Sequence, residues 1–168
     1  MNPVLRHWPW VALASCLAVL GAAHAFETFG HLAPCELCLK ARAIYWAAAA
    51  TAAVGGLLGL TPLKPARWAN VLLAMVFLAG VGLGVYHAGV EWKFWAGPAS
   101  CTGGHVQVST ADLTRLLNGG PIAVPACDKA AWRFLGLSMA GWNVPISLTL
   151  AALSALAFSV SRPEARRP

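Results

Sequence analysis

Charged residues are scarce in this chain. Aspartate, glutamate, lysine and arginine make up 11% of its 168 residues, whereas hydrophobic residues make up 58%. An ordinary soluble domain carries about 25% charged residues, and one of this length buries too little surface to hide so many apolar side chains. The shortage also excludes a highly charged disordered chain, and the net charge of +6 is too dispersed to predict nucleic-acid binding. We therefore expect a protein whose apolar surface faces a lipid bilayer.

Four stretches of the sequence contain no charged residue at all. They extend over about 8–26, 43–60, 68–85 and 144–160. Each has roughly the 17 to 25 residues that a membrane-spanning helix needs, and their many glycines and alanines allow such helices to approach closely. The sequence therefore predicts an all-α membrane protein, a four-transmembrane-helix bundle formed by residues 1–168 as a single domain. A short loop (about 27–42) and a long loop (86–143) would join the helices.

Basic residues are concentrated in three short pieces of the chain. They are Arg6 near the N-terminus, Lys64 and Arg67 between the second and third stretches, and Arg162, Arg166 and Arg167 in the tail. Short basic segments stay on the cytoplasmic side of a membrane, so we expect both termini inside and the two longer loops outside. Leu13–Cys16 and Ala23–Ala25 also resemble lipidation and signal-cleavage patterns, but the apolar run continues past Cys16, which favours an uncleaved first helix.

Cysteines occupy both outer loops. Cys35 and Cys38 form a C-x-x-C in the short loop, Cys101 and Cys127 lie in the long one, and Cys16 falls inside the first stretch as a small buried side chain. Thiols outside the cytoplasm tend to form disulfides, and four cysteines allow three pairings. The sequence leaves open both the pairing and the choice between structural and redox-active disulfides.

Three features of the C-x-x-C favour redox chemistry over a structural link. Pro34 precedes Cys35 at the expected start of the second helix, and a helix N-terminus stabilises a thiolate. Arg42 lies one helical turn after Cys38, where its charge favours a thiolate further, although a snorkelling interfacial arginine is the alternative. The pair also lies at the mouth of a membrane helix, an unusual place for a structural disulfide.

A redox-active dithiol needs an electron acceptor, and the chain has no G-x-G-x-x-G motif for a flavin or nicotinamide. A membrane quinone is the natural two-electron acceptor at this depth, and Arg42 is placed to hydrogen-bond one of its oxygens. His87 and Glu91, four residues apart, predict either an interfacial ion pair or a proton path to the acceptor. No second C-x-x-C or H-x-x-x-H at zinc spacing follows, so we predict no metal site.

The long outer loop carries two different cysteine environments. Glycines and a proline flank Cys101, which predicts an exposed cysteine open to a protein partner. After Cys127, the apolar and basic residues of 129–139 predict a short amphipathic helix lying on the membrane, which would hold Cys127 near its surface.

These motifs together resemble the disulfide bond formation protein B (DsbB) family of bacterial inner-membrane proteins. The resemblance covers nearly the whole chain. It rests on the four helices, Pro34-Cys35-Glu36-Leu37-Cys38 followed by Arg42, the two cysteines of the long loop, and Ala126-Cys127-Asp128 leading into 132–137.

The resemblance implies a relay of electrons through the four loop cysteines. A periplasmic thioredoxin-fold oxidase of the DsbA type would attack Cys101 and release Cys127, which would then attack Cys35. Cys38 would remain as the thiolate facing ubiquinone or menaquinone beside Arg42, with His87 as a candidate quinone-side residue. Ala41, where many members have a polar or acidic residue, departs from the family pattern.

Two other functions fit parts of the pattern. A membrane thiol reductase similar to vitamin K epoxide reductase is one, but its relatives keep the redox C-x-x-C at the last helix, and residues 144–160 here contain no cysteine. The other is a thiol-based heavy-metal transporter that uses Cys16 together with the loop cysteines.

Overall fold

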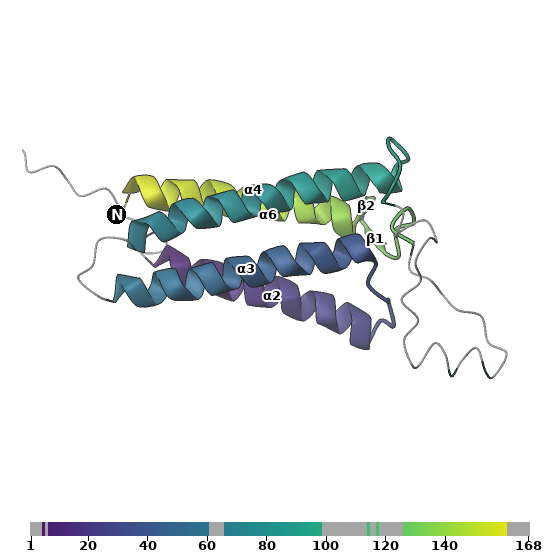
Figure 1. Ribbon diagram of the computed structural model, residues 1–168, viewed down its shortest axis with the longest axis horizontal. Helices are drawn as coiled ribbons and strands as arrows, with labels where there is room; N and C mark the ends of the chain where they lie inside the picture. Colours follow the sequence, from purple (N-terminus) through teal and green to yellow (C-terminus); the bar gives the residue numbers. More distant parts are fainter. Residues whose placement is uncertain are drawn as a thin grey trace, which may run out of the picture.

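The computed structural model describes Leu5, residues 7–60, 66–98, Thr114, Leu117 and 126–160. Its main elements are four long helices: α2 (Trp8–Thr28), α3 (Glu36–Gly59), α4 (Ala66–Glu91) and α6 (Met139–Val160). The helices lie alongside one another along the long axis of the molecule (Figure 1). Within the described ranges, these four are long and apolar enough to cross a membrane. The predicted four-helix membrane bundle is confirmed.

The helices extend beyond the uncharged stretches at the end that carries the C-x-x-C. Helix α3 begins at Glu36 rather than near 43, α4 continues to Glu91 rather than 85, and α6 begins at Met139 rather than 144. An uncharged stretch marks the part of a helix that can lie in the hydrocarbon core of a bilayer. The helix itself can continue into polar residues outside that core, because its backbone hydrogen bonds do not depend on apolar side chains. The outer loops are correspondingly shorter than predicted.

Small side chains bring the helices close together. The buried residues of α3 are Leu37, Tyr45, Ala48, Ala49, Ala52, Gly55 and Gly56. A Cβ atom added to Gly55 would lie 2.5 Å from the Cβ of Ala69 on α4, so only glycine allows this approach. Helix α4 packs against both α3 and α6, and α2 packs against α3. This is the close packing that small residues permit in membranes.

Polar side chains inside the bundle are paired across helices. The Trp8 indole N–H on α2 donates to the Ser154 hydroxyl on α6 at 2.9 Å. The Tyr45 hydroxyl on α3 donates to Asn143 Oδ1 on α6 at 2.8 Å and lies 3.1 Å from the Ser147 hydroxyl. Without water, an unpaired polar group is costly, so these bonds fix which faces of the helices meet.

The segment before α6 forms a β-hairpin, not the predicted amphipathic helix. Strands β1 (Arg133–Phe134) and β2 (Leu137–Ser138) pair antiparallel, with Phe134 opposite Leu137. The two residues between them, Leu135 and Gly136, have φ values of 51° and 81°. Two consecutive positive φ angles are typical of the tight type I′ turn, which reverses the chain where a helix would continue. The amphipathic pattern was therefore misleading here.

Candidate redox site

The start of α3, the end of α4 and the β1–β2 hairpin gather at one end of the bundle (Figure 1). Cys35 is the N-cap residue of α3, and its Sγ accepts a hydrogen bond from the Cys38 backbone N–H at 3.3 Å. Pro34 before the cap and Glu36 in the first turn are residues that favour a helix start. The structure thus confirms the predicted position of the C-x-x-C at a helix N-terminus.

The two cysteines of this motif face each other as free thiols. Their sulfur atoms lie 2.7 Å apart, against about 2.0 Å in a disulfide, so the pair closes with little rearrangement. The hydrogen bond with Cys38 raises the pKa of the Cys35 thiol, and burial raises it further. Cys35 is therefore the member of the pair that keeps its proton at neutral pH.

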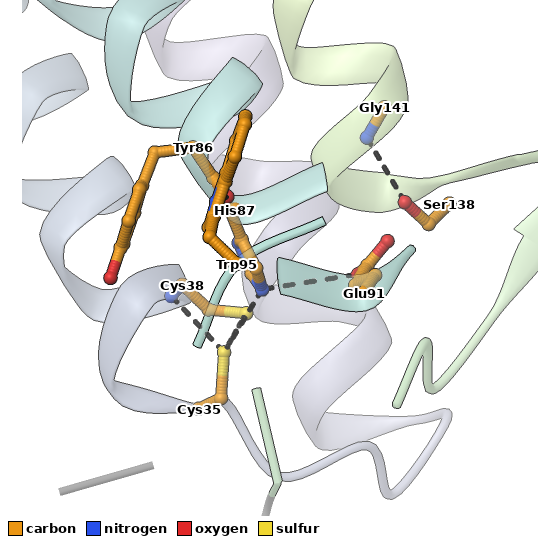
Figure 2. Close-up of polar contacts among 8 residues, drawn as sticks. All are labelled: Cys35, Cys38, Tyr86, His87, Glu91, Trp95, Ser138 and Gly141. Carbon is orange, nitrogen blue, oxygen red and sulfur yellow. Dashed lines mark hydrogen bonds and ion pairs between the residues drawn. The ribbon is translucent and has the colours of Figure 1, made fainter. Parts of the chain in front are cut away.

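His87 reaches this pair from α4. Its Nε2 lies 3.6 Å from Cys35 Sγ and 3.8 Å from Glu91 Oε1, as the dashed lines of Figure 2 show. The predicted pairing of His87 with Glu91 is confirmed, but both side chains are buried, at 8% and 5% exposure, rather than interfacial. The contact with Cys35 joins residues 52 positions apart, which no local sequence pattern could reveal.

Arg42 is held by the end of α2. Its Nη1 donates to the Glu27 carboxylate in an ion pair, and its Nη2 donates to the Ala23 carbonyl oxygen at 3.1 Å. The side chain is only 15% exposed, so it does not snorkel into solvent. Glu27, which no sequence motif singles out, positions this arginine in the structure.

A cavity of about 420 Å³ opens beside the cysteines. Most of its wall is apolar and comes from α2, α3, α4, α6 and the hairpin region, including Phe26, Leu83, Trp132, Phe134, Trp142 and Ile146. Its polar wall residues include Cys38, Arg42, His87, Tyr45 and Asn143. The structure therefore brings the three predicted quinone-site residues to one chamber. Tyr45 and Asn143 are wall residues that the sequence did not single out: Tyr45 lies inside an apolar stretch, and Asn143 lies just before one.

Cys127 lies buried against the C-x-x-C. It is 1% exposed and packs in one apolar cluster with Cys35, Leu37 and Val90, with Cys38 at its edge. Cys127 is disulfide-bonded. The other predicted relay residue, Cys101, lies outside the described residues. Cys127 therefore lies next to the thiol that it is predicted to attack.

An ion pair secures the segment that carries Cys127. Lys93, just after α4, donates to the carboxylate of Asp128, the residue that follows Cys127. This hydrogen bond holds the pKa of Asp128 below its usual range. The carboxylate is therefore ionised at neutral pH, and the pair joins the Cys127 segment to the end of α4.

Cys16 belongs to a different part of the molecule. It is fully buried in the central core cluster of the bundle, with Trp8, Ala12 and Leu20 from its own helix. The group of potential metal ligands near the bundle end consists of Cys35, Cys38 and His87. The arrangement gives Cys16 no part in that site.

Comparison with known proteins agrees with this geometry. The family model described as "Disulfide bond formation protein DsbB" matches residues 5–157. A disulfide bond formation protein B from Aromatoleum aromaticum is 32% identical over 152 residues, covering 85% of each chain. Those from Dechloromonas aromatica and Nitrosococcus oceani are 29% and 28% identical, covering 92% and 83% of this chain and 92% and 82% of their own. The chain is a multi-pass membrane protein that belongs to the DsbB family of disulfide bond formation proteins.

Proposed function

We propose that this chain is a thiol:quinone oxidoreductase of the bacterial inner membrane. It reoxidises a periplasmic DsbA-type thioredoxin-fold oxidase and transfers the electrons to ubiquinone or menaquinone. The observation that carries this proposal is the apolar cavity whose wall contains Cys38, Arg42 and His87. Its volume lies within the range of small-molecule sites, and it combines a redox-active sulfur with a few polar groups on an apolar wall.

The cavity wall fits a quinone. Arg42 supplies guanidinium N–H donors, and His87 supplies a ring nitrogen, on a wall that is otherwise mainly apolar. A bound quinone supplies the oxidising power by accepting two electrons and two protons. Arg42 stabilises negative charge that develops on an acceptor oxygen, and Glu27 keeps the guanidinium in place for this. The His87–Glu91 pair is the buried route by which a proton leaves Cys35.

The four loop cysteines form two disulfides in the proposed resting enzyme, Cys35–Cys38 and Cys101–Cys127. The partner's thiolate attacks Cys101 and releases Cys127, which attacks Cys35 and releases Cys38 as a thiolate. The partner's second thiol then completes its own disulfide and releases Cys101, which attacks Cys127 and frees Cys35. Two electrons and two protons have then moved from the partner to the C-x-x-C. Burial of Cys127 in one cluster with Cys35 supports the central step.

The experiment combines the purified full-length protein, a reduced DsbA-type oxidase and a soluble short-chain quinone. We expect one quinone to be consumed, by its absorbance, for each partner disulfide formed. Cys38→Ser should reduce the rate to the level without enzyme, and Cys16→Ala should keep the wild-type rate because Cys16 lies in a separate cluster. Wild-type turnover by the Cys38→Ser protein would show that the proposed relay is wrong.

A further inference from the structure

Three side chains with soft ligand atoms meet at the buried end of α3 and α4. The ligand atoms of Cys35, Cys38 and His87 all lie within 4.8 Å of one another. Figure 2 shows the two sulfur atoms and the imidazole ring converging from the two helices. Thiolate and imidazole are the ligands that Zn²⁺ prefers, and two cysteines with one histidine make up a known three-ligand set.

The spacing of these atoms is close to that of a tetrahedral site. With bonds of about 2.3 Å to sulfur and about 2.0 Å to nitrogen, neighbouring ligand atoms lie about 3.5 to 3.8 Å apart. Cys35 Sγ and His87 Nε2 are 3.6 Å apart, which already matches. The two sulfurs, 2.7 Å apart, need to separate by about 1 Å for the same geometry. A side-chain rotation of Cys38, which is not fully buried, provides this movement.

Glu91, one helical turn beyond His87, lies outside this group of three but next to its histidine. Its side chain is 5% exposed, and Oε1 lies 3.8 Å from His87 Nε2. Its Oε2 finds no hydrogen-bond partner among the residues that the structure describes. A buried carboxylate oxygen without a partner is costly, and a bound cation would satisfy it. The same carboxyl group also has a side-chain hydrogen bond with Ser138, and Oε2 is the oxygen that remains available to a ligand.

We propose that the reduced form of this protein binds Zn²⁺ through Cys35, Cys38 and His87, with Glu91 as the fourth ligand. The metal replaces the two thiol protons, which pass to solvent, and no electron is transferred. Closing the Cys35–Cys38 disulfide removes both thiolates, so the oxidised protein does not bind the metal. Zinc binding itself is independent of the proposed function. We also expect bound Zn²⁺ to trap the reduced dithiol and so to inhibit turnover reversibly. This expected inhibition rests on the proposed function.

The test is a titration of the full-length protein, reduced with a phosphine in detergent, with Co²⁺ as the spectroscopic probe. We expect one Co²⁺ per chain, with thiolate charge-transfer bands and the visible bands of a tetrahedral ion, displaced by Zn²⁺. The oxidised protein should show none of these bands. Cys38→Ser and His87→Ala should weaken binding at least about 100-fold, and Glu91→Gln about 10-fold.

A matched control is available on α2. His24 and Glu27 form a histidine–glutamate pair at the same 3.8 Å distance, but with the histidine side chain 55% exposed and no place in the ligand group. His24→Ala should leave Co²⁺ binding unchanged. His87→Cys, which keeps a soft ligand, should retain a tetrahedral spectrum with stronger thiolate bands, and this separates ligand loss from misfolding.

The outcomes of the metal and turnover experiments are distinguishable. A reduced wild-type protein without tetrahedral bands, or bands unchanged in both the Cys38→Ser and His87→Ala proteins, would overturn the zinc site. Metal binding with the expected ligand dependence, in a protein that does not oxidise the partner, would support the zinc site and contradict only the proposed function. Full turnover with Zn²⁺ bound would show that the site is not inhibitory.

Discussion

Arg42 illustrates how a single side chain is prepared for its role before any ligand arrives. Two of its terminal nitrogens are bonded to α2, one to the Glu27 carboxylate and the other to the Ala23 carbonyl oxygen. A long arginine side chain otherwise loses considerable rotamer freedom when it engages a ligand. Because α2 already fixes the guanidinium on the cavity wall, this loss would not weaken binding of the proposed quinone.

Arg42→Ala should lower kcat/KM for the quinone by about 10- to 100-fold, since a hydrogen bond from a charged group contributes about 1.5–3 kcal/mol. Glu27→Gln should give a smaller loss, because the arginine stays but is less firmly held. Lys40→Ala is the matched control: this cation pairs with Glu36 on the exposed side of α3. Steady-state rates at varied quinone concentration measure all three. Equal losses in the Arg42 and Lys40 variants would contradict the specific role of Arg42.

The two thiols of the C-x-x-C should differ in reactivity. Cys35 is 6% exposed, and its hydrogen bond with Cys38 raises its pKa, so it keeps its proton at neutral pH. Only the thiolate is nucleophilic, so limiting iodoacetamide should alkylate Cys38 first in the reduced protein, with chelator present. Peptide mass spectrometry reads the order, and raising the pH should increase the share of Cys35.

Removing Cys38 tests the cause of this difference. In Cys38→Ala, the side-chain hydrogen bond and the charge of Cys38 are lost, and only burial still raises the pKa of Cys35. Cys35 should then react faster than in the wild-type protein at the same pH. A slower reaction would show that the hydrogen bond with Cys38 does not control the ionisation of Cys35.

At the scale of elements, the helices were predictable because one simple quantity, the absence of charge over about 20 residues, defines what a bilayer can hold. The position of Cys35 at the start of α3 was also predictable, because proline and helix caps act locally. The contacts of His87 with Cys35 and of Arg42 with Glu27 were not, because they depend on how separate helices are turned toward each other. Packing decides that rotation, and the sequence pattern of small residues does not specify it.

The β1–β2 hairpin shows where periodicity alone fails. A short, mainly apolar run fits either a helix or a strand, and its length and turn residues decide between them. Gly136→Ala should destabilise the protein by about 1–2 kcal/mol, because alanine resists the positive φ of 81° at this position. Gly82→Ala on α4 is the control, since its added Cβ meets no atom within 4 Å. Unfolding in mixed SDS micelles measures both, and an equal response would argue against the turn.

At the scale of the whole molecule, the two ends of the bundle have different chemistry. The thiols, the cavity and the hairpin lie at the end where α3 begins, whereas the short basic segments of the sequence adjoin the other ends of the helices. Because short basic segments resist translocation, this charge distribution predicts that the thiols face the compartment opposite to the basic ends. Under the proposed function, that compartment would be the oxidising periplasm, where the proposed dithiol relay would meet its partner.

This orientation predicts the side from which each end can be labelled. Phe29, at the end of α2 near the cysteines, is 82% exposed, and Leu60, after α3 at the opposite end, is 75% exposed. In a chain whose five cysteines are replaced by alanine, Phe29→Cys should react with a membrane-impermeant maleimide in intact bacterial cells whose outer membrane is permeabilised. Leu60→Cys should react only after the inner membrane is also opened, and full labelling of both variants in detergent is the control. The reverse pattern would place the thiols in the reducing cytoplasm, where the proposed net oxidation of a periplasmic partner is impossible.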